Sequence, residues 1–240
     1  MSAALAACRT LFLDAGGVLV NPSWSRVSEA LAREGVVVSA ERLAAAEPPA
    51  KLEIDQAAVI GRTTDRSRGG LYFRTVLRHA GVPPAEGVEA ALEAIYAYHQ
   101  RENLWEDTAP GLREALAAFR EMGLRLVVVS NANGRLHHLL DRLALTPAFD
   151  AVIDSHLWGV EKPDPRLFQH ALDAAGATAA DTVHVGDLYH VDVVGARAAG
   201  LADAVLVDVA GLYAGADCLR VADLAALARL MRDLRAPTAR

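Results

Sequence analysis

The chain has 240 residues, of which 52% are hydrophobic and 22% are charged, and its formal net charge is −6. This length is enough for a sizeable buried core in one domain with an insertion, or in two small domains. The negative charge comes with no basic stripe, so we expect no nucleic acid and no membrane as partner, and a small-molecule ligand is favoured.

Cysteine usage and hydropathy favour a cytoplasmic protein. Cys8 and Cys218 lie far apart without metal-ligand spacing, so two reduced thiols are expected. Arg9 and Asp14 interrupt the apolar N-terminal stretch, which argues against a signal peptide. No run approaches the roughly 20 apolar residues that a membrane-spanning helix needs.

The first predicted element is a strand over residues 11–14, "LFLD", which ends in Asp14 and is followed after one residue by two glycines. Continuous rather than alternating apolarity is typical of a strand buried on both faces, as in a parallel sheet. The sequence therefore places a carboxylate where a buried strand enters a turn.

Residues 22–105 contain no β-rich run and predict a helical block. Ser23 and Ser39 are each placed to cap a helix. Pro48 and Pro49 are expected to break the chain before a third helix near residues 52–60. Two further helices are marked by apolar residues at helical spacing, which are Phe73, Val76, Leu77, Val88, Leu92 and Ile95. Since most loops have only about 2 to 6 residues, a block of this length predicts an inserted helical cap.

From residue 110 onward, apolar runs alternate with helical patterns. The runs "LRLVVVS", "AVIDS", "DTVHVGD" and "AVLVDV" predict four more strands, with leucine-rich helices among them. This alternation predicts an α/β fold with a doubly wound, Rossmann-like parallel sheet, which binds ligands at the carboxyl ends of its strands. The predicted domains are a core of residues 1–21 and 106–240 and a helical cap of residues 22–105.

Four polar residues fall at or just after predicted strand ends, and they are Asp14, Ser130, Lys162 and Asp187. Taken singly, each has an ordinary explanation as a turn, a helix cap or a solvated surface residue. Their occurrence in series at one edge of the predicted sheet favours a functional site.

The stretches around these residues resemble the motifs of a known family. "LFLDAGGVL", "VVVSNA", "VEKPDPRLF" and "VHVGDLYHVDVVGARAAG" are similar to the four motifs of the haloacid dehalogenase-like (HAD) hydrolases, a superfamily of mostly Mg²⁺-dependent phosphatases. The similarity runs from about residue 9 to 210, and the helical block lies where the helical-cap members of the family carry theirs. The resemblance implies a hydrolase, and most directly a phosphatase.

The family also implies a metal site. By resemblance, Asp14 is the nucleophile that forms an aspartyl-phosphate, and it is a Mg²⁺ ligand as well. Asp187 would be the second metal-binding carboxylate, and the backbone carbonyl of Gly16 would complete the protein's ligands. Mg²⁺ typically takes only one or two carboxylates plus waters and substrate oxygens, so this small set is adequate.

The remaining implied roles concern the phosphoryl group. Ser130 and Lys162 would be catalytic residues that also bind the substrate, with Asn131 beside them. Lys162 would lower the repulsion between the anionic nucleophile and the anionic phosphate. Asp192 would orient metal-bound waters or Lys162, or else cap the helix that runs to Gly200.

Two residues of the first motif depart from the family pattern. The phosphatases usually read DxDGT, and their second Asp is a general acid and base, whereas this chain reads DAGGV and has Gly16 at that position and Val18 in place of Thr. General acid–base assistance typically contributes roughly 10² to 10⁴ in rate. His190, in the loop after Asp187, is a candidate for a substitute acid.

Three functions are compatible with this pattern. The first is a Mg²⁺-dependent phosphatase acting on a small phosphorylated metabolite, with a substitute acid or a substrate that has a good leaving group. The second is a haloacid dehalogenase or a phosphonate C–P hydrolase, for which Lys51 is the only lysine in the predicted cap. The third is a catalytically weak phosphate-binding regulatory protein.

Overall fold

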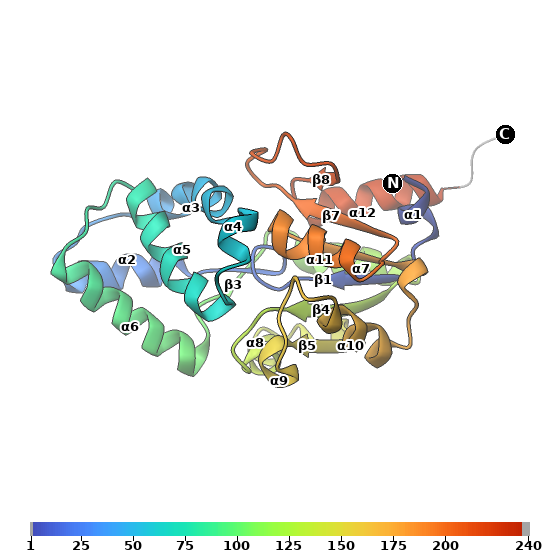
Figure 1. Ribbon diagram of the computed structural model, residues 1–240, viewed down its shortest axis with the longest axis horizontal. Coiled ribbons are helices and arrows are strands. Elements are labelled where there is room, and N and C mark those ends of the chain that lie inside the picture. The colour runs from blue at the N-terminus through green and yellow to red at the C-terminus, as the bar shows by residue number, and fades with distance from the viewer. Residues whose placement is uncertain (1, 237–240) are drawn as a thin grey trace. The chain divides into compact units, whose positions relative to one another are not determined.

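The computed structural model describes residues 2–236, and the chain divides into two compact units. The first, here called the core unit, comprises Met1–Val20 and Thr108–Arg240 (Figure 1). The second, here called the helical unit, comprises Asn21–Asp107. The two chain crossings carry the strands β2 (Val20–Asn21) and β3 (Asp107–Thr108), which form a small sheet of their own.

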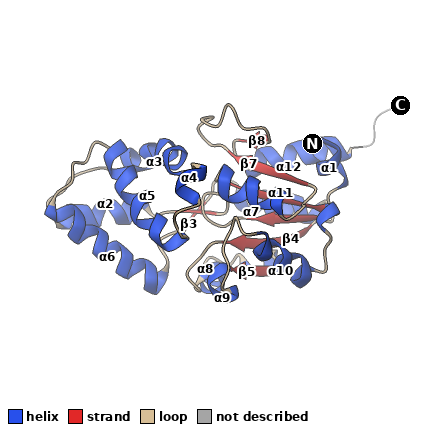
Figure 2. Cartoon of the chain, viewed as in Figure 1, coloured by secondary structure: helices blue, strands red, loops and turns tan. Residues whose placement is uncertain are grey.

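The core unit is built on a six-stranded parallel sheet with the order β5-β4-β1-β6-β7-β8 (Figure 2). Its strands are β1 (Thr10–Leu13), β4 (Arg125–Ser130), β5 (Ala151–Asp154), β6 (Thr182–Gly186), β7 (Asp203–Val207) and β8 (Leu219–Val221). In the register of the sheet, Leu13 pairs with Val128 of β4 and Val185 of β6. The carboxyl ends of β4, β1 and β6 therefore lie side by side.

Helices pack against this sheet. Helix α10 (Pro165–Ala175) contacts β4 and β5, and α11 (Val194–Ala198) contacts α10 and β7. The other helices are α1 (Ser2–Ala7), α7 (Leu112–Glu121), α8 (Leu136–Arg142), α9 (Ser155–Trp158) and α12 (Leu224–Arg235), with short turns η1 (Thr146–Ala148) and η2 (Ala179–Asp181) and the π-helical η3 (Tyr189–Val193). The predicted α/β class with a parallel sheet is confirmed.

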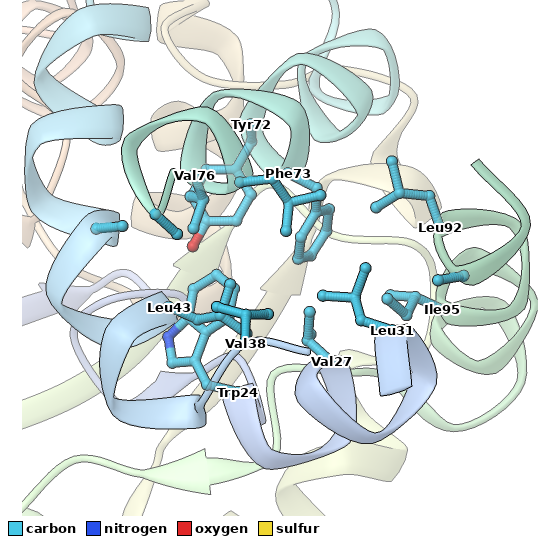
Figure 3. Close-up of a cluster of buried hydrophobic side chains, with 14 of the residues drawn as sticks. Trp24, Val27, Leu31, Val38, Leu43, Tyr72, Phe73, Val76, Leu92 and Ile95 are labelled. Atoms are coloured by element: carbon cyan, nitrogen blue, oxygen red, sulfur yellow. The ribbon is translucent and has the colours of Figure 1, made fainter. Parts of the chain in front are cut away.

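The helical unit has a separate hydrophobic core. The helices of this unit are α2 (Trp24–Arg33), α3 (Ala40–Ile54), α4 (Ala57–Ile60), α5 (Asp65–His79) and α6 (Glu86–Glu102). Trp24, Tyr72 and Phe73 pack with neighbouring aliphatic side chains at its centre (Figure 3). As predicted, Ser39 caps α3, since its hydroxyl accepts a hydrogen bond from Arg42 N.

The expected break at the two prolines is wrong, because α3 continues through Pro48 and Pro49. Proline has no N–H, so each one costs the helix a backbone hydrogen bond. The buried side chains before and after the prolines, Leu43 and Ile54 among them, belong to the same hydrophobic cluster. Packing of one continuous helix face against the unit's core outweighs the local cost.

Within residues 2–236, no helix is long and apolar enough to cross a membrane.

Candidate active site

Three of the predicted residues meet at the carboxyl edge of the sheet. Asp14 follows β1 directly, and its N–H donates to the carbonyl of Val185 at 2.9 Å, which extends the pairing with β6. Ser130 is the last residue of β4, and Asp187 follows β6. Since β4, β1 and β6 are adjacent, the parallel register brings these three buried side chains to one place.

The backbone of the turn after Asp14 explains why residue 17 is glycine but not why residue 16 is. Gly17 has φ 72°, a conformation that L side chains rarely adopt, and its N–H donates to Val20 O at 2.8 Å. Gly16 is not among the glycines with positive φ. The backbone therefore demands glycine at position 17 and does not demand it at position 16.

Lys162 reaches the site from a loop and not from a strand end. The expectation that it falls at or just after a strand end is wrong, because β5 ends at Asp154 and α9 intervenes. Its ammonium lies 2.9 Å from Oδ1 of Asp14 and 2.6 Å from Oδ1 of Asp192, and the residue is fully buried. The lysine thus joins two carboxylates that come from different parts of the chain.

Asn131 holds the main chain of Lys162. Its side-chain Oδ1 accepts a hydrogen bond from Lys162 N at 2.7 Å, and its Nδ2 donates to Lys162 O at 3.0 Å. The sequence placed Asn131 among the substrate-binding residues. In the structure its side-chain amide fixes the lysine's backbone, and the contact of Asn131 with phosphate stays a prediction.

Asp192 accepts four hydrogen bonds. Oδ1 accepts from Lys162 Nζ and lies 2.9 Å from Nε2 of His184, while Oδ2 accepts from the N–H groups of Asp187 and Leu188 at 3.1 and 3.0 Å. A Cβ on Gly186 would lie 2.0 Å from Cγ of Asp192, which explains the glycine before Asp187. The alternative reading of Asp192 as a helix cap is wrong, because it lies inside η3.

Two residues escaped the sequence analysis. His184 was included in a predicted strand, yet its imidazole is fully buried and lies against Asp192. Asp154, at the end of β5, accepts hydrogen bonds from the N–H groups of Gly134 and Leu136 and so orders the loop that follows Ser130. Both residues could have been identified from the sequence, because each is a polar residue within or at the end of an apolar run that predicts a buried strand.

The electrostatics of the site follow from burial and from one shared cation. Burial raises the pKa of Asp14, and the neighbouring Asp192 charge raises it further, against the opposing effect of Lys162. Burial alone would lower the pKa of Lys162, but the charges of Asp14 and Asp192 outweigh it and the pKa is raised. Burial alone would raise the pKa of Asp192, but Lys162 and the hydrogen bond to His184 lower it overall. The amine is therefore protonated and Asp192 is ionised.

These residues fit a divalent cation. Oxygen atoms of Asp14, Asp187 and Asp192 lie within 4.8 Å of one another, and all three residues are buried. Ionised, they carry three negative charges against the one positive charge of Lys162. Because both oxygens of Asp192 already accept two hydrogen bonds each, Asp14 and Asp187 are the better ligands. Carboxylates without sulfur or imidazole ligands suit Mg²⁺.

His190, the candidate acid, lies on η3 between Asp187 and Asp192. Its ring packs edge to face on Tyr189, with ring centroids 5.2 Å apart. The Tyr189 hydroxyl in turn donates to Asp217 at 2.6 Å and so connects η3 to the segment before β8.

Comparison with known proteins extends the resemblance seen in the motifs. Residues 8–200 match the family described as haloacid dehalogenase-like hydrolase. The chain is 38% identical over 122 residues to haloacid dehalogenase-like hydrolase domain-containing protein 3 of Bos taurus, covering 51% of this chain and 48% of that protein. It is 38% identical over 137 residues to a phosphoserine phosphatase of Thermus thermophilus, and this match covers 57% of this chain and 53% of that protein.

The chain thus matches about half the length of these curated relatives. Among solved structures, the HAD hydrolase YfnB of Bacillus subtilis, determined with bound magnesium, superposes with a TM-score of 0.70. That superposition covers 93% of this chain and 98% of YfnB at 16% identity, and it supports the fold alone.

Proposed function

Because this chain belongs to the haloacid dehalogenase-like hydrolases, we propose that it is a Mg²⁺-dependent phosphatase that acts on a small phosphorylated metabolite through an aspartyl-phosphate on Asp14. The observation that carries the proposal is the position of the Lys162 ammonium, 2.9 Å from Asp14 in a buried cluster of carboxylates. A nucleophilic carboxylate and a phosphate ester repel each other, and this cation offsets that repulsion.

Asp14 attacks phosphorus with one oxygen of its carboxylate. Oδ1 accepts hydrogen bonds from Ala15 N at 2.8 Å and from Lys162 Nζ, which hold the carboxylate in place. The bond from the attacking oxygen to phosphorus forms as the bond from phosphorus to the leaving oxygen breaks. Ser130 and the main chain of Asn131 bind the phosphoryl oxygens, and Lys162 neutralises part of their charge.

The residues that would hold Mg²⁺ are Asp14, Asp187 and the backbone carbonyl of Gly16. When bound, the ion supplies positive charge to the phosphoryl oxygens and balances the excess of carboxylates around Lys162. Asp192 remains with Lys162, His184 and two backbone N–H groups, and it holds the lysine in place.

Gly16 limits the substrates. With no carboxyl group at this position, the leaving group receives no proton from it, so acyl and aryl phosphates are better substrates than alkyl phosphates. His190 is a further candidate donor, and its removal by His190→Ala would lower kcat on an alkyl phosphate. Unchanged kcat in that variant would remove His190 from the mechanism.

The alternative reactions have less support. Dehalogenases of this superfamily work without a metal and usually lack the carboxylate that Asp187 supplies here. A phosphonate hydrolase needs a neutral lysine to form a Schiff base, whereas Lys51 is paired with buried Glu47, with Nζ and Oε1 2.8 Å apart. An ion pair of this kind favours the protonated amine. A phosphate-binding regulatory protein would keep the same site with little turnover.

One panel of assays separates these functions. Purified protein is incubated with alkyl, aryl and acyl phosphates, phosphonoacetaldehyde and 2-haloacids, with and without Mg²⁺, and Asp14→Asn is the control. The proposal predicts Mg²⁺-dependent phosphate release that the Asp14→Asn variant abolishes. Metal-independent halide release, phosphonate cleavage or no turnover on the whole panel would contradict it.

A further inference from the structure

One buried side chain beside the site has no role in the mechanism described so far. His184 lies on β6, three residues before Asp187, and none of it is exposed to solvent. Its Nε2 lies 2.9 Å from Oδ1 of Asp192, the same oxygen that accepts from Lys162. Its ring packs edge to face on Phe168 of α10, with centroids 5.0 Å apart.

The hydrogen-bond pattern fixes the form of this imidazole. An ionised carboxylate only accepts, so a proton lies on Nε2; burial lowers the pKa of His184 and favours the neutral imidazole, in which Nδ1 is an acceptor. Among the described residues, Nδ1 has no hydrogen-bond partner although it is buried. A buried polar atom without a partner is unfavourable, and an aliphatic side chain would avoid that cost. The contact with Asp192 is the feature of this position that an aliphatic residue could not reproduce.

We propose that His184 is a positioning residue that holds the Lys162 ammonium against Asp14 by fixing the carboxylate of Asp192. This inference rests on the proposed function for its effect on rate, but its structural part is independent of any substrate. Two backbone N–H groups fix Oδ2, and His184 and Lys162 share Oδ1. Without the imidazole donor, Asp192 has one fewer restraint on the oxygen that holds the lysine.

The expected consequence lies at Lys162. When the carboxylate of Asp192 loses the His184 donor at Oδ1, we expect it either to rotate or to draw the Lys162 ammonium closer. In both cases the ammonium moves relative to Asp14. A displacement of this kind affects substrate binding less than rate, because Ser130 and Asn131 also bind the phosphoryl group, whereas the positive charge is misplaced during phosphoryl transfer. The variant His184→Leu removes the donor at similar volume. His184→Gln keeps an N–H donor near the position of Nε2.

The chain offers a direct probe of this lysine, because its only lysines are Lys51 and Lys162. Selective ¹⁵N labelling of lysine gives one ammonium signal from each unit, and Lys51 is an internal reference. We expect His184→Leu to shift the Lys162 signal, His184→Gln to restore it, and both variants to leave Lys51 unchanged. The control is Val183→Ala, a buried truncation at the adjacent position of the same strand, where side chains alternate between the two faces of the sheet.

Kinetics on an aryl phosphate with saturating Mg²⁺ supply the second measurement. We expect His184→Leu to lower kcat about 10- to 100-fold with KM nearly unchanged, and His184→Gln to recover most of the loss. An unmoved Lys162 signal in His184→Leu, or a loss in Val183→Ala as large as in His184→Leu, would overturn the proposal. If His184→Leu does not fold, His184→Gln alone tests the proposal. A shifted Lys162 ammonium signal together with a low kcat in His184→Gln would overturn it.

The two proposals fail differently. If the wild-type protein releases no phosphate but the lysine signal responds as described, the phosphatase function fails and the positioning role stands. If the wild type is active and neither the lysine signal nor kcat depends on His184, only the positioning role fails.

Discussion

The ammonium of Lys162 lies 2.6 Å from Oδ1 of Asp192, and each side chain is only 1% exposed. Burying two charges costs desolvation that their attraction often does no more than offset, so such a pair is weak evidence for stability. The same ammonium also contacts Asp14. A buried cation shared by two carboxylates is better explained by the chemistry proposed for Asp14 than by the needs of the fold.

Removing this cation is expected to destabilise the core unit. Lys162→Met leaves the carboxylates of Asp14 and Asp192 buried without their partner, and breaking a buried pair costs about 3 to 5 kcal/mol of unfolding free energy. Urea denaturation followed by circular dichroism measures the change. The matched control is Arg166→Met, which removes an exposed cation paired with Asp164 and should change stability little. Equal midpoints for Lys162→Met and the wild type would contradict the assignment of charges.

Mg²⁺ is expected to stabilise the folded protein. Any ion that binds only the folded state at one hundred times its Kd adds about 2.7 kcal/mol, which raises Tm by several degrees. Differential scanning calorimetry with and without Mg²⁺ measures this shift. Asp187→Asn should remove most of it, while the exposed control Glu93→Gln should keep it. A shift of wild-type size in Asp187→Asn would exclude that residue as a ligand.

Restoring the missing carboxyl group is expected to broaden the substrate range. Gly16 does not need positive φ, so Gly16→Asp should be compatible with the backbone, in contrast to any side chain at Gly17. A general acid contributes a factor of roughly 10² to 10⁴ in rate, so kcat/KM on an alkyl phosphate should rise while kcat/KM on an aryl phosphate, whose leaving group needs no proton, changes little. Gly16→Asn, which cannot donate a carboxyl proton, is the control. The absence of any gain in a folded, Mg²⁺-binding Gly16→Asp protein would contradict the missing-acid account.

The helical unit should have a pH-dependent contribution from Glu47. Its carboxylate accepts hydrogen bonds from Tyr72 OH at 2.7 Å and Trp24 Nε1 at 3.1 Å, and it is paired with Lys51. Burial opposes ionisation, but Lys51 and these donors outweigh it and lower the pKa below the ordinary 4.5. Folding therefore favours the ionised form, and the stabilisation is complete above about pH 4.5 and is lost as the pH falls through the lowered pKa.

The variant Glu47→Gln tests this pair. At pH 7 it should lower the unfolding free energy by about 2 kcal/mol, since hydrogen bonds to a charged group are worth about 1.5 to 3 kcal/mol. Denaturation at a series of pH values should show the difference from wild type shrinking below about pH 4.5. A difference that stays constant down to pH 3 would show that the charge of Glu47 is not responsible.

The sequence predicted the parts of the site that depend on strand ends. Asp14, Ser130 and Asp187 each follow a continuous apolar run, and a parallel sheet brings the carboxyl ends of such runs together. Lys162 was also predicted at or just after a strand end, and this is wrong, because a loop after α9 carries it and no local periodicity describes that path. Strand β8 has three residues, too few to give an apolar run.

Other features depend on contacts that no local pattern encodes. His184 meets Asp192 only because η3 turns the chain back over the end of β6, and the side-chain amide of Asn131 bonds to a backbone 31 residues away. The continuation of α3 through two prolines depends on packing within the helical unit. In each case a tertiary contact overrides or supplements the local preference.

The most direct test of the central claim is the covalent state of Asp14. Protein mixed with acetyl phosphate and Mg²⁺ is quenched in acid and measured by intact-mass spectrometry. Without a carboxyl group at Gly16 to activate water, the aspartyl-phosphate should persist, and the spectrum should show one added phosphoryl group. The adduct should be absent from Asp14→Asn and present in Glu93→Gln. An adduct that survives in Asp14→Asn, or phosphate release with no adduct at any time in the wild type, would contradict the assignment of Asp14 as the nucleophile.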